Sequence, residues 1–425
     1  MIIQRNYYLN KLIKKKHNGL VKIITGLRRS GKSYLLFTLF YNHLLESGVD
    51  HKHIITLSLD ELANDKYRNI DNLRQYIYSF IKDDEMYYIL LDEVQFAIDP
   101  NEMKNGGYCK LYGLLNEFLH SGHLDVYITG SNSRFLSSDI QTEFRGRGDE
   151  LRIYPLTFKE FLPSCDKDTD KAFEEYCYFG GMPYIATQKD EETKQEYLKK
   201  LLKLTYINDI VERNNLNNAE ILNDLLNILA SSIGSLTNPS KLVRAFASRN
   251  VKTNAVTIKN YLKLLEDSFL ISSAYRFDIK GKLYLTTPLK YYFADVGLRN
   301  AQLNFRQNEP SHILENVIYN ELLARGYNVD VGIVPIQETI NNKRTLNTYE
   351  VDFVCNKFDK RYYIQSALTL DTIGKLEQET QSFRRIEDGF EKIIITKDKI
   401  KSYINEDGYK IVTVIDFLLD ENFLK

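Results

Sequence analysis

Three short, nearly unbroken hydrophobic runs punctuate the first part of the chain, at residues 20–25, 87–91 and 124–129. Each run has the length of one strand, and such runs are typical of strands buried on both faces of a parallel sheet. After the first run, apolar residues at 34–40 recur at helical spacing. The pattern predicts an α/β domain with a parallel sheet core over residues 1–165.

The middle of the chain changes to helical periodicity. Three helical patterns follow one another, at residues 221–233, 239–247 and 256–266. Thr253 or Asn254 offers an N-cap for the third pattern. Two β-like segments come next, YRFD and KLYLTTPLKYYFAD, and they read as a hairpin. We therefore predict a helical and winged-helix domain over residues 166–305.

In a winged helix-turn-helix, the second helix of the pair enters the major groove of DNA. Several polar side chains on and beside the third pattern could face phosphates or bases: Lys252, Thr257, Lys259, Asn260 and Lys263. Winged helices also serve as protein-packing modules. Contact with DNA and contact with a partner protein both stay open.

Composition narrows the class of protein. The chain has 425 residues, of which 43% are hydrophobic and 27% charged, so it has material for two or three globular domains. The formal net charge is −1, which excludes a basic field over the whole molecule. Any contact with nucleic acid must therefore be local.

The four cysteines are widely spaced and form no C-x-x-C pair, which argues against a zinc or redox site. No uncharged apolar run approaches the roughly 18 residues that a membrane span needs. The expectation is a soluble, cytoplasmic protein without membrane contact.

Candidate chemistry begins directly after the first hydrophobic run, with GLRRSGKSYLLF at residues 26–37. The segment fits G-x-x-x-x-G-K-[ST], in which backbone N–H groups of a glycine-rich loop surround phosphate oxygens at a helix start. Lys32 would reach the β and γ phosphates, and Ser33 would bind Mg²⁺. The predicted nucleotide-binding residues are Gly26, Leu27, Arg28, Arg29, Ser30, Gly31, Lys32, Ser33 and Tyr34.

The second run ends in two carboxylates, in YYILLDEVQ. Ligands of open α/β sheets bind beyond the carboxyl ends of the strands, where Asp92 and Glu93 fall. We expect Asp92 to bind magnesium and Glu93 to orient or polarise the attacking water. Simple solvation of a strand end is the alternative, which the neighbouring phosphate loop disfavours.

The third run leads into polar residues of TGSNSRFL, where Asn132 could bind a γ-phosphate or the lytic water. A later segment, FRGRGDELRIYPLTFKEF, places Arg145 and Arg147 among glycines. Either arginine could act as a finger that completes a neighbouring subunit's site. Simple pairing with Asp149 or Glu150 is the alternative.

Taken together, these segments resemble AAA-type ATPases of bacteria and archaea that carry a C-terminal domain of unknown function with a nuclease-like core. The resemblance rests on GLRRSGKS, LLDEVQ, TGSNSRFL, FRGRG, LTFKEFL, YFGGMPYI, YFADVGLRNA, ILENVIYNELLARGY and EVDFV. It implies a P-loop core with Asp92 and Glu93 acting on magnesium and water. It further implies Asn132 as a sensor of the γ-phosphate and Arg147 as the finger.

The resemblance extends to a degenerate nuclease-like domain over residues 306–425, related to the PD-(D/E)xK pattern. Glu315 and Asp352 match carboxylate positions, but Gln365 and Ala367 stand where a carboxylate and a lysine are expected. An amide cannot neutralise a divalent ion as a carboxylate does. We therefore expect this domain not to cut DNA.

The resulting hypothesis is an oligomeric, Mg²⁺-dependent ATPase that is coupled to DNA binding or remodelling. A nucleotide-gated switch or scaffold that recruits protein partners is the rival hypothesis. DNA-stimulated turnover would favour the first, and turnover that is indifferent to DNA would favour the second.

Overall fold

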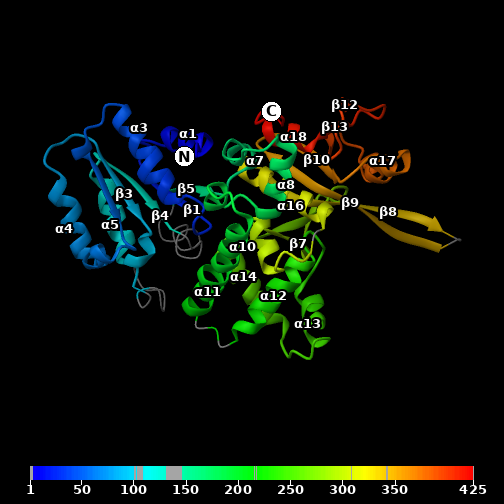
Figure 1. The fold of residues 1–425 in the computed structure, drawn as a ribbon, viewed down its shortest axis with the longest axis horizontal. Helices are drawn as coiled ribbons and strands as arrows, with labels where there is room; N and C mark the ends of the chain where they lie inside the picture. Colours follow the sequence, from blue (N-terminus) through cyan, green and yellow to red (C-terminus); the bar gives the residue numbers. More distant parts are fainter. Residues whose placement is uncertain are drawn as a thin grey trace. The chain divides into compact units, whose positions relative to one another are not determined.

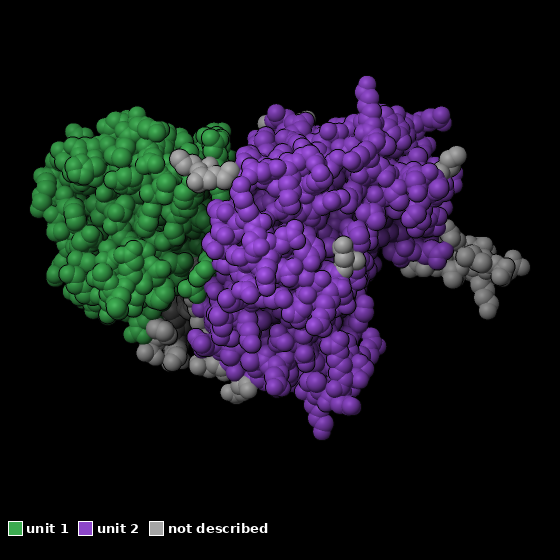
Figure 2. Space-filling view, in the orientation of Figure 1, with its two compact units in different colours: residues 1–155, 267–269 green, residues 156–266, 270–425 purple. Residues whose placement is uncertain are grey.

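A computed structural model describes residues 3–99, 102, 109–130, 146–214, 216, 218–307, 309–340 and 343–424. The chain forms two compact units (Figure 2). Unit 1 comprises Met1–Pro155 and Asp267–Phe269, and unit 2 comprises Leu156–Glu266 and Leu270–Lys425. No helix in the described ranges is long and apolar enough to cross a bilayer.

Unit 1 contains a five-stranded parallel sheet in the order β2-β3-β4-β1-β5 (Figure 1). Its strands are β1 (Val21–Gly26), β2 (Ile54–Ser58), β3 (Tyr87–Asp92), β4 (Leu124–Thr129) and β5 (Gly148–Ile153). The parallel α/β core predicted from the three hydrophobic runs is confirmed, since β1, β3 and β4 occupy those runs. These three strands lie together at the centre of the sheet.

Helices cover both faces of this sheet because each strand buries alternate side chains on opposite sides. One face packs α1 and the helix that follows β1 against Ile24, Leu90 and Tyr127. The other face packs α4 and α5 against Ile89 and Val126. The helical segments are α1 (Asn6–Lys14), α2 (Lys32–Tyr34), the π-type η1 (Leu35–Phe40), α3 (Tyr41–Glu46), η2 (His51–His53), η3 (Leu62–Arg68), α4 (Ile70–Phe80), η4 (Val94–Ala97) and α5 (Lys110–His120).

Unit 2 begins with a largely helical region. Its segments are α7 (Phe158–Phe161), η7 (Leu162–Ser164), α8 (Thr169–Phe179), α9 (Pro183–Ala186), α10 (Glu191–Lys200), the π-type η8 (Leu201–Ile207), α11 (Asn208–Arg213), α12 (Ala219–Ser231), α13 (Pro239–Ala247), α14 (Ala255–Asp267), α15 (Val296–Gln302) and α16 (Pro310–Ala324). Helices α12, α13 and α14 match the three predicted helical patterns, and the hairpin β6–β7 follows them. This is the element order of a winged helix.

A mixed eight-stranded sheet completes unit 2, in the order β12-β13-β11-β10-β9-β8-β6-β7. Its strands are β6 (Ile271–Asp278), β7 (Leu283–Phe293), β8 (Asn328–Ile340), β9 (Lys343–Lys357), β10 (Lys360–Ala367), β11 (Glu391–Thr396), β12 (Tyr403–Ile404) and β13 (Lys410–Thr413), with α17 (Ile373–Thr380), η9 (Phe383–Arg385) and α18 (Val414–Leu419) between or after them. Strand β6 pairs in parallel with β8, so the hairpin and the C-terminal region share one sheet. This pairing spans residue 305, where the sequence suggested a domain boundary.

Two sequence motifs far apart in the chain, YFGGMPYI and YFADVGLRNA, meet at α15. Asp295 caps α15 by accepting the N–H of Leu298, and it also accepts the N–H of Gly181 at 2.7 Å. A Cβ at Gly181 would lie 2.1 Å from the carbonyl oxygen of Leu156. Asn300 donates to the carbonyl of Tyr178 at the end of α8. The two motifs therefore fix α8 against α15.

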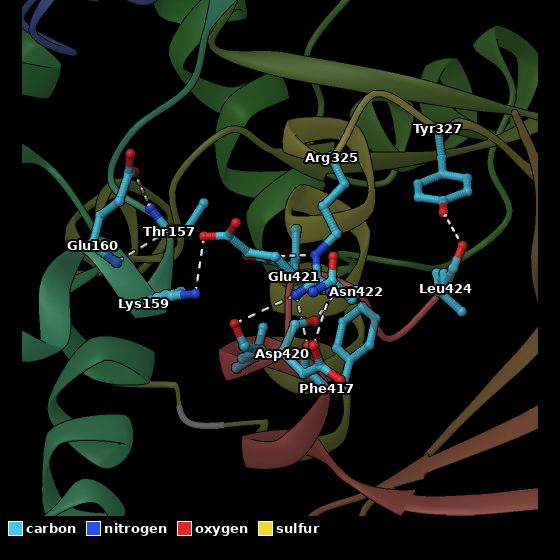
Figure 3. Close-up of polar contacts among 12 residues, drawn as sticks. Thr157, Lys159, Glu160, Arg325, Tyr327, Phe417, Asp420, Glu421, Asn422 and Leu424 are labelled. Atoms are coloured by element: carbon cyan, nitrogen blue, oxygen red, sulfur yellow. Dashed lines mark hydrogen bonds and ion pairs between the residues drawn. The ribbon is translucent and has the colours of Figure 1, made fainter. Parts of the chain in front are cut away.

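The C-terminal segment is tied back onto unit 2 by polar contacts (Figure 3). Arg325, directly after α16, donates to the carbonyls of Phe417 at 2.6 Å and Asp420 at 3.0 Å. The carbonyl of Leu424 accepts the hydroxyl of Tyr327 at 2.8 Å. Lys159 and Glu421 form an ion pair. The bonds from Arg325 supply donors to carbonyls of the last turn of α18, where a helix provides no following N–H groups.

Candidate functional site

The loop between β1 and α2 has a backbone that requires glycine. Gly26 has φ 138° and Gly31 has φ 98°, both in the region that side chains disfavour. A Cβ at Gly26 would lie 2.1 Å from the carbonyl oxygen of Ile153 on the neighbouring strand β5. The loop can therefore leave the sheet at this point only with glycine.

A buried arginine supports this loop from the N-terminal segment. Arg5 donates one hydrogen bond to the carbonyl of Ser30 and one to the carbonyl of Tyr154, each at 2.8 Å. Its side chain is 1% exposed and lies over the ring of Tyr8. Buried guanidinium groups hold their acceptors in fixed geometry, so Arg5 fixes the loop relative to the segment after β5.

Lys32 starts α2, and its ammonium donates to the carbonyls of Gly26 and Leu27 at 3.1 Å each. Burial lowers the pKa of this ammonium, while the nearby Glu93 and Asp92 carboxylates oppose that shift. The first amides of a helix have no partner in a preceding turn, and the helix dipole favours an anion there. The loop thus combines an ammonium and a helix start, which is an arrangement suited to phosphate.

Two buried hydroxyls of the same segment, Ser30 Oγ and Tyr34 Oη, have no hydrogen-bond partner in the part of the chain that the structure describes. Buried hydroxyls are normally paired, and exceptions concentrate at sites that bind something. These groups fit a polar ligand such as a triphosphate.

Asp92 closes β3 and is buried beside the loop. It accepts a hydrogen bond from the hydroxyl of Thr129, and the hydroxyl of Ser33 lies close enough to lower its pKa. Burial raises the pKa of the Asp92 carboxyl, and the two hydroxyls lower it. The structure therefore brings Ser33 and Asp92 together, as the sequence predicts for two residues around one magnesium ion. A carboxylate and a hydroxyl are oxygen ligands of the type that Mg²⁺ prefers.

Glu93 turns the chain away from the sheet, with φ 50° and ψ 49°. Its N–H donates to Thr129 Oγ1 at 3.0 Å, and its carboxylate accepts the side-chain amide of Gln95. A left-handed non-glycine residue is uncommon and is often found where function requires a particular side-chain direction. Glu93 is therefore held by contacts on both its backbone and its side chain.

Arg147 lies at the opposite end of the strands from the phosphate loop. It immediately precedes β5, whose first residue pairs with Val21, the first residue of β1. Five strand residues span on the order of 17 Å, which separates Arg147 from the loop at the other end of β1. The exposed Arg147 side chain donates to Asn116 at 2.8 Å. Asn132 and Arg145 lie outside the described residues.

In unit 2, the polar side chains predicted around the third helical pattern lie on one side of α14. Lys252, Lys259, Asn260 and Lys263 are exposed, whereas Ile258 and Leu262 are buried against the helical core. Asn254 accepts the N–H of Thr257, so it is the N-cap of the two candidates. The helix presents an exposed face with Lys259, Asn260 and Lys263, and Lys252 lies shortly before its first residue, Ala255.

Glu315 and Asp352, predicted from the nuclease-like pattern, also lie near each other in unit 2. Both are buried, and both face the ammonium of Lys290 on β7. Gln365 accepts the N–H of Asp352 at 3.3 Å, whereas Ala367 contributes only to the hydrophobic core. Within the described ranges, no three His, Cys, Asp or Glu side chains are grouped as a metal site.

Sequence reasoning missed Arg5, Thr129 and Lys290. Thr129 offered a signal, because it ends the predicted strand beside the one that carries Asp92. Arg5 and Lys290 are single basic residues outside any motif, and only tertiary structure brings them to these sites.

Comparisons with known proteins agree with this geometry. Residues 18–162 match an AAA domain, and residues 170–309 match a domain of unknown function (DUF8612). An uncharacterized protein of Haemophilus influenzae is 34% identical over 424 residues, which cover 98% of this chain and 99% of that protein. The uncharacterized protein MJ1544 of Methanocaldococcus jannaschii is 30% identical over 412 residues, with coverages of 93% and 85%. The Walker-type ATPase paby2304 of Pyrococcus abyssi has a TM-score of 0.49 at 15% identity, covering 71% of this chain and 96% of its own.

The sheet order, the loop and the matched domain define the class: unit 1 has the AAA-type P-loop fold. The chain belongs to the family that includes the Haemophilus influenzae protein and MJ1544.

Proposed function

We propose that the protein hydrolyses ATP in a Mg²⁺-dependent reaction at the loop after β1. The observation that carries the proposal is the placement of the Ser33 hydroxyl beside the buried Asp92 carboxylate, next to the buried ammonium of Lys32. Such a group supplies the two side chains needed for a magnesium ion and one cation for phosphate oxygens. The hydroxyls of Ser30 and Tyr34, which have no hydrogen-bond partner among the described residues, support the proposal as further polar groups in this loop.

Each residue has a distinct task in this proposal. The loop amides and Lys32 bind and orient the phosphates, and Ser33 and Asp92 hold the metal ion. Bound Mg²⁺ supplies charge stabilisation to the phosphate oxygens. Glu93, held by Gln95, orients a water molecule and accepts its proton.

The structure bears on whether the one guanine-binding motif in the sequence could select GTP over ATP. One N-K-x-D sequence, a guanine-reading pattern, occurs at residues 356–359. It lies at the β9–β10 turn of unit 2, where Lys357 donates to the carbonyl of Arg325 and Asn356 accepts the guanidinium of Arg361. Both side chains are engaged within unit 2, so this sequence gives no support to guanine binding.

The test is nucleotide affinity and steady-state turnover for two variants. Lys32→Ala should lose nucleotide binding because it removes a ground-state phosphate contact. Glu93→Gln should keep binding and lose turnover because its task concerns the water. Gln95→Glu is a useful companion, since it replaces the amide that holds Glu93 with a repelling carboxylate. Turnover in Glu93→Gln equal to that of the wild type would remove Glu93 from the proposed role.

We further propose that turnover is coupled to duplex DNA through the exposed face of α14. Lys259 and Lys263 lie on the exposed face of α14, Lys252 lies shortly before its start, and each phosphate contact they make should release counterions. DNA should therefore stimulate turnover, and replacing all three lysines with glutamine should reduce that stimulation and the salt dependence of binding. Replacement of the exposed Lys401 is the matched control. Turnover that is unaffected by DNA would favour the nucleotide-gated recruitment of a protein partner.

A further inference from the structure

A buried ammonium lies among three carboxylates in unit 2. Lys290 Nζ is 2.8 Å from Glu315 Oε1, 2.7 Å from Glu350 Oε1 and 4.0 Å from Asp352 Oδ1. The lysine comes from β7, Glu315 from α16, and the other two carboxylates from β9. We call these four residues the Lys290 cluster.

Lys290, Glu315 and Asp352 are buried, whereas the Glu350 side chain is 35% exposed. Lys290 is 3% exposed, and Glu315 and Asp352 are each 8% exposed. Burial alone would lower the pKa of the Lys290 ammonium, but Glu315, Asp352 and Glu350 raise it above its ordinary value. The lysine therefore carries its charge within the cluster, as a buried cation with paired anions around it.

Two of the carboxylates also accept hydrogen bonds from other protein groups. Tyr292, also on β7, donates its hydroxyl to Glu315 at 2.6 Å. Asp352 accepts the N–H and the hydroxyl of Ser366 at 2.8 and 2.9 Å. Burial raises the pKa of Glu315 to about 7, a shift that Lys290 opposes. The carboxylates are thus oriented toward the ammonium and toward fixed donors.

We infer that Lys290 is the resident cation of this cluster and occupies the place that a divalent metal ion would need. A Mg²⁺ ion bound by Glu315 and Asp352 would have to lie about 2.0–2.1 Å from an oxygen of each, between the two carboxylates that the ammonium already faces at 2.8 and 4.0 Å. Two cations at that separation would repel each other strongly in a buried site. The wild-type cluster therefore excludes divalent metal, and loss of the ammonium creates a metal site.

The test uses Mn²⁺ as the probe and nucleotide-free, full-length protein. Bound Mn²⁺ is counted from the decrease in the free-ion EPR signal, and the thermal unfolding midpoint is recorded with and without Mn²⁺. Wild type and Asp352→Asn should bind Mn²⁺ equally. Lys290→Met, which keeps the length and removes the charge, should bind one additional ion per chain and gain thermal stability with Mn²⁺.

Two controls make the assignment specific. Lys290→Met combined with Asp352→Asn should lose the additional ion, and Lys290→Arg, which keeps the charge, should not acquire it. If Lys290→Met does not fold, the same measurements are made on the double variant Lys290→Met, Glu350→Gln. The second substitution removes a carboxylate that the loss of Lys290 would leave without its cation. Two results would overturn the inference: a wild-type Mn²⁺ site that Asp352→Asn abolishes, or a folded Lys290→Met protein, with or without Glu350→Gln, that gains no Mn²⁺. Both readouts are independent of ATP hydrolysis.

Discussion

The hydroxyl of Thr129, at the end of β4, donates a hydrogen bond to the carboxylate of Asp92, at the end of the neighbouring β3. The same oxygen accepts the N–H of Glu93 at 3.0 Å. One side chain therefore orients both carboxyl-bearing residues of the candidate site. Groups that orient a metal ligand in this way contribute to metal affinity without touching the ion.

Thr129→Val should lower Mg²⁺-dependent turnover by about 10- to 100-fold, because it keeps the shape of the side chain and removes the donor to Asp92. The fall should be partly relieved by higher Mg²⁺ concentration. Turnover is measured across a magnesium titration. Thr129→Ser keeps the hydroxyl and is the control; a Thr129→Val enzyme with wild-type magnesium dependence would contradict the prediction.

Gly26→Ala should abolish nucleotide binding and destabilise unit 1 by several kcal/mol, since the new Cβ would meet the carbonyl of Ile153 at 2.1 Å. Gly48→Ala is the matched control: Gly48 also has a positive φ, but nothing lies within 4 Å of its would-be Cβ. That control should cost only about 1–2 kcal/mol and leave affinity unchanged. Denaturant unfolding and nucleotide titration measure the two effects. Equal behaviour of the two variants would show that the contact with β5 does not constrain the loop.

Arg147 should act on the site of a neighbouring subunit, since its own phosphate loop lies at the other end of β1. A finger supplied in trans is worth about a thousandfold or more in rate. Arg147→Ala and Lys32→Ala proteins should each be inactive alone and recover turnover when mixed, because mixed interfaces pair an intact loop with an intact arginine. Asn116→Ala frees Arg147 from its contact within unit 1 and serves as a companion variant. An inactive mixture, with wild-type turnover per chain constant on dilution, would refute action in trans.

The C-terminal region should bind no catalytic metal and cut no DNA. Gln365 offers only a neutral amide near Asp352, and Ala367 offers no charge to stabilise the transition state. The missing charge should raise the activation barrier by several kcal/mol. Supercoiled, linear and single-stranded DNA are incubated at length with the protein in Mg²⁺ and in Mn²⁺. If the protein nicks DNA and Asp352→Ala abolishes the nicking, the prediction is wrong and this region is a nuclease.

The sequence predicted those features of the fold that depend on local patterns. Continuous apolar runs located β1, β3 and β4, because strands buried on both faces require apolar residues. The glycine spacing located the loop, because positive φ angles favour glycine. The contacts of Arg5 and Lys290 could not be predicted from any local sequence pattern. Arg5 reaches residues 25 and 149 positions away, and Lys290 reaches α16 and β9, so their roles follow only from how the elements pack.

The domain boundary near residue 305 illustrates the same difference between local and non-local information. The family resemblance suggested that boundary, whereas sheet pairing continues across it from β6 to β8. Arg147 lies at the end of the strands opposite the phosphate loop because of the register of β5 with β1, and residue types alone do not specify that register.

The parallel pairing of β6 with β8 has a consequence for truncation of this chain and for the exchange of its regions by recombination. A chain that stopped after α15 would leave the edge of β6 without its partner, and open strand edges recruit other chains. The same cut would remove the anions that neutralise Lys290. The helical region and the C-terminal region are therefore not interchangeable modules: a recombination event between them would need to supply a new strand and new counter-charges at once.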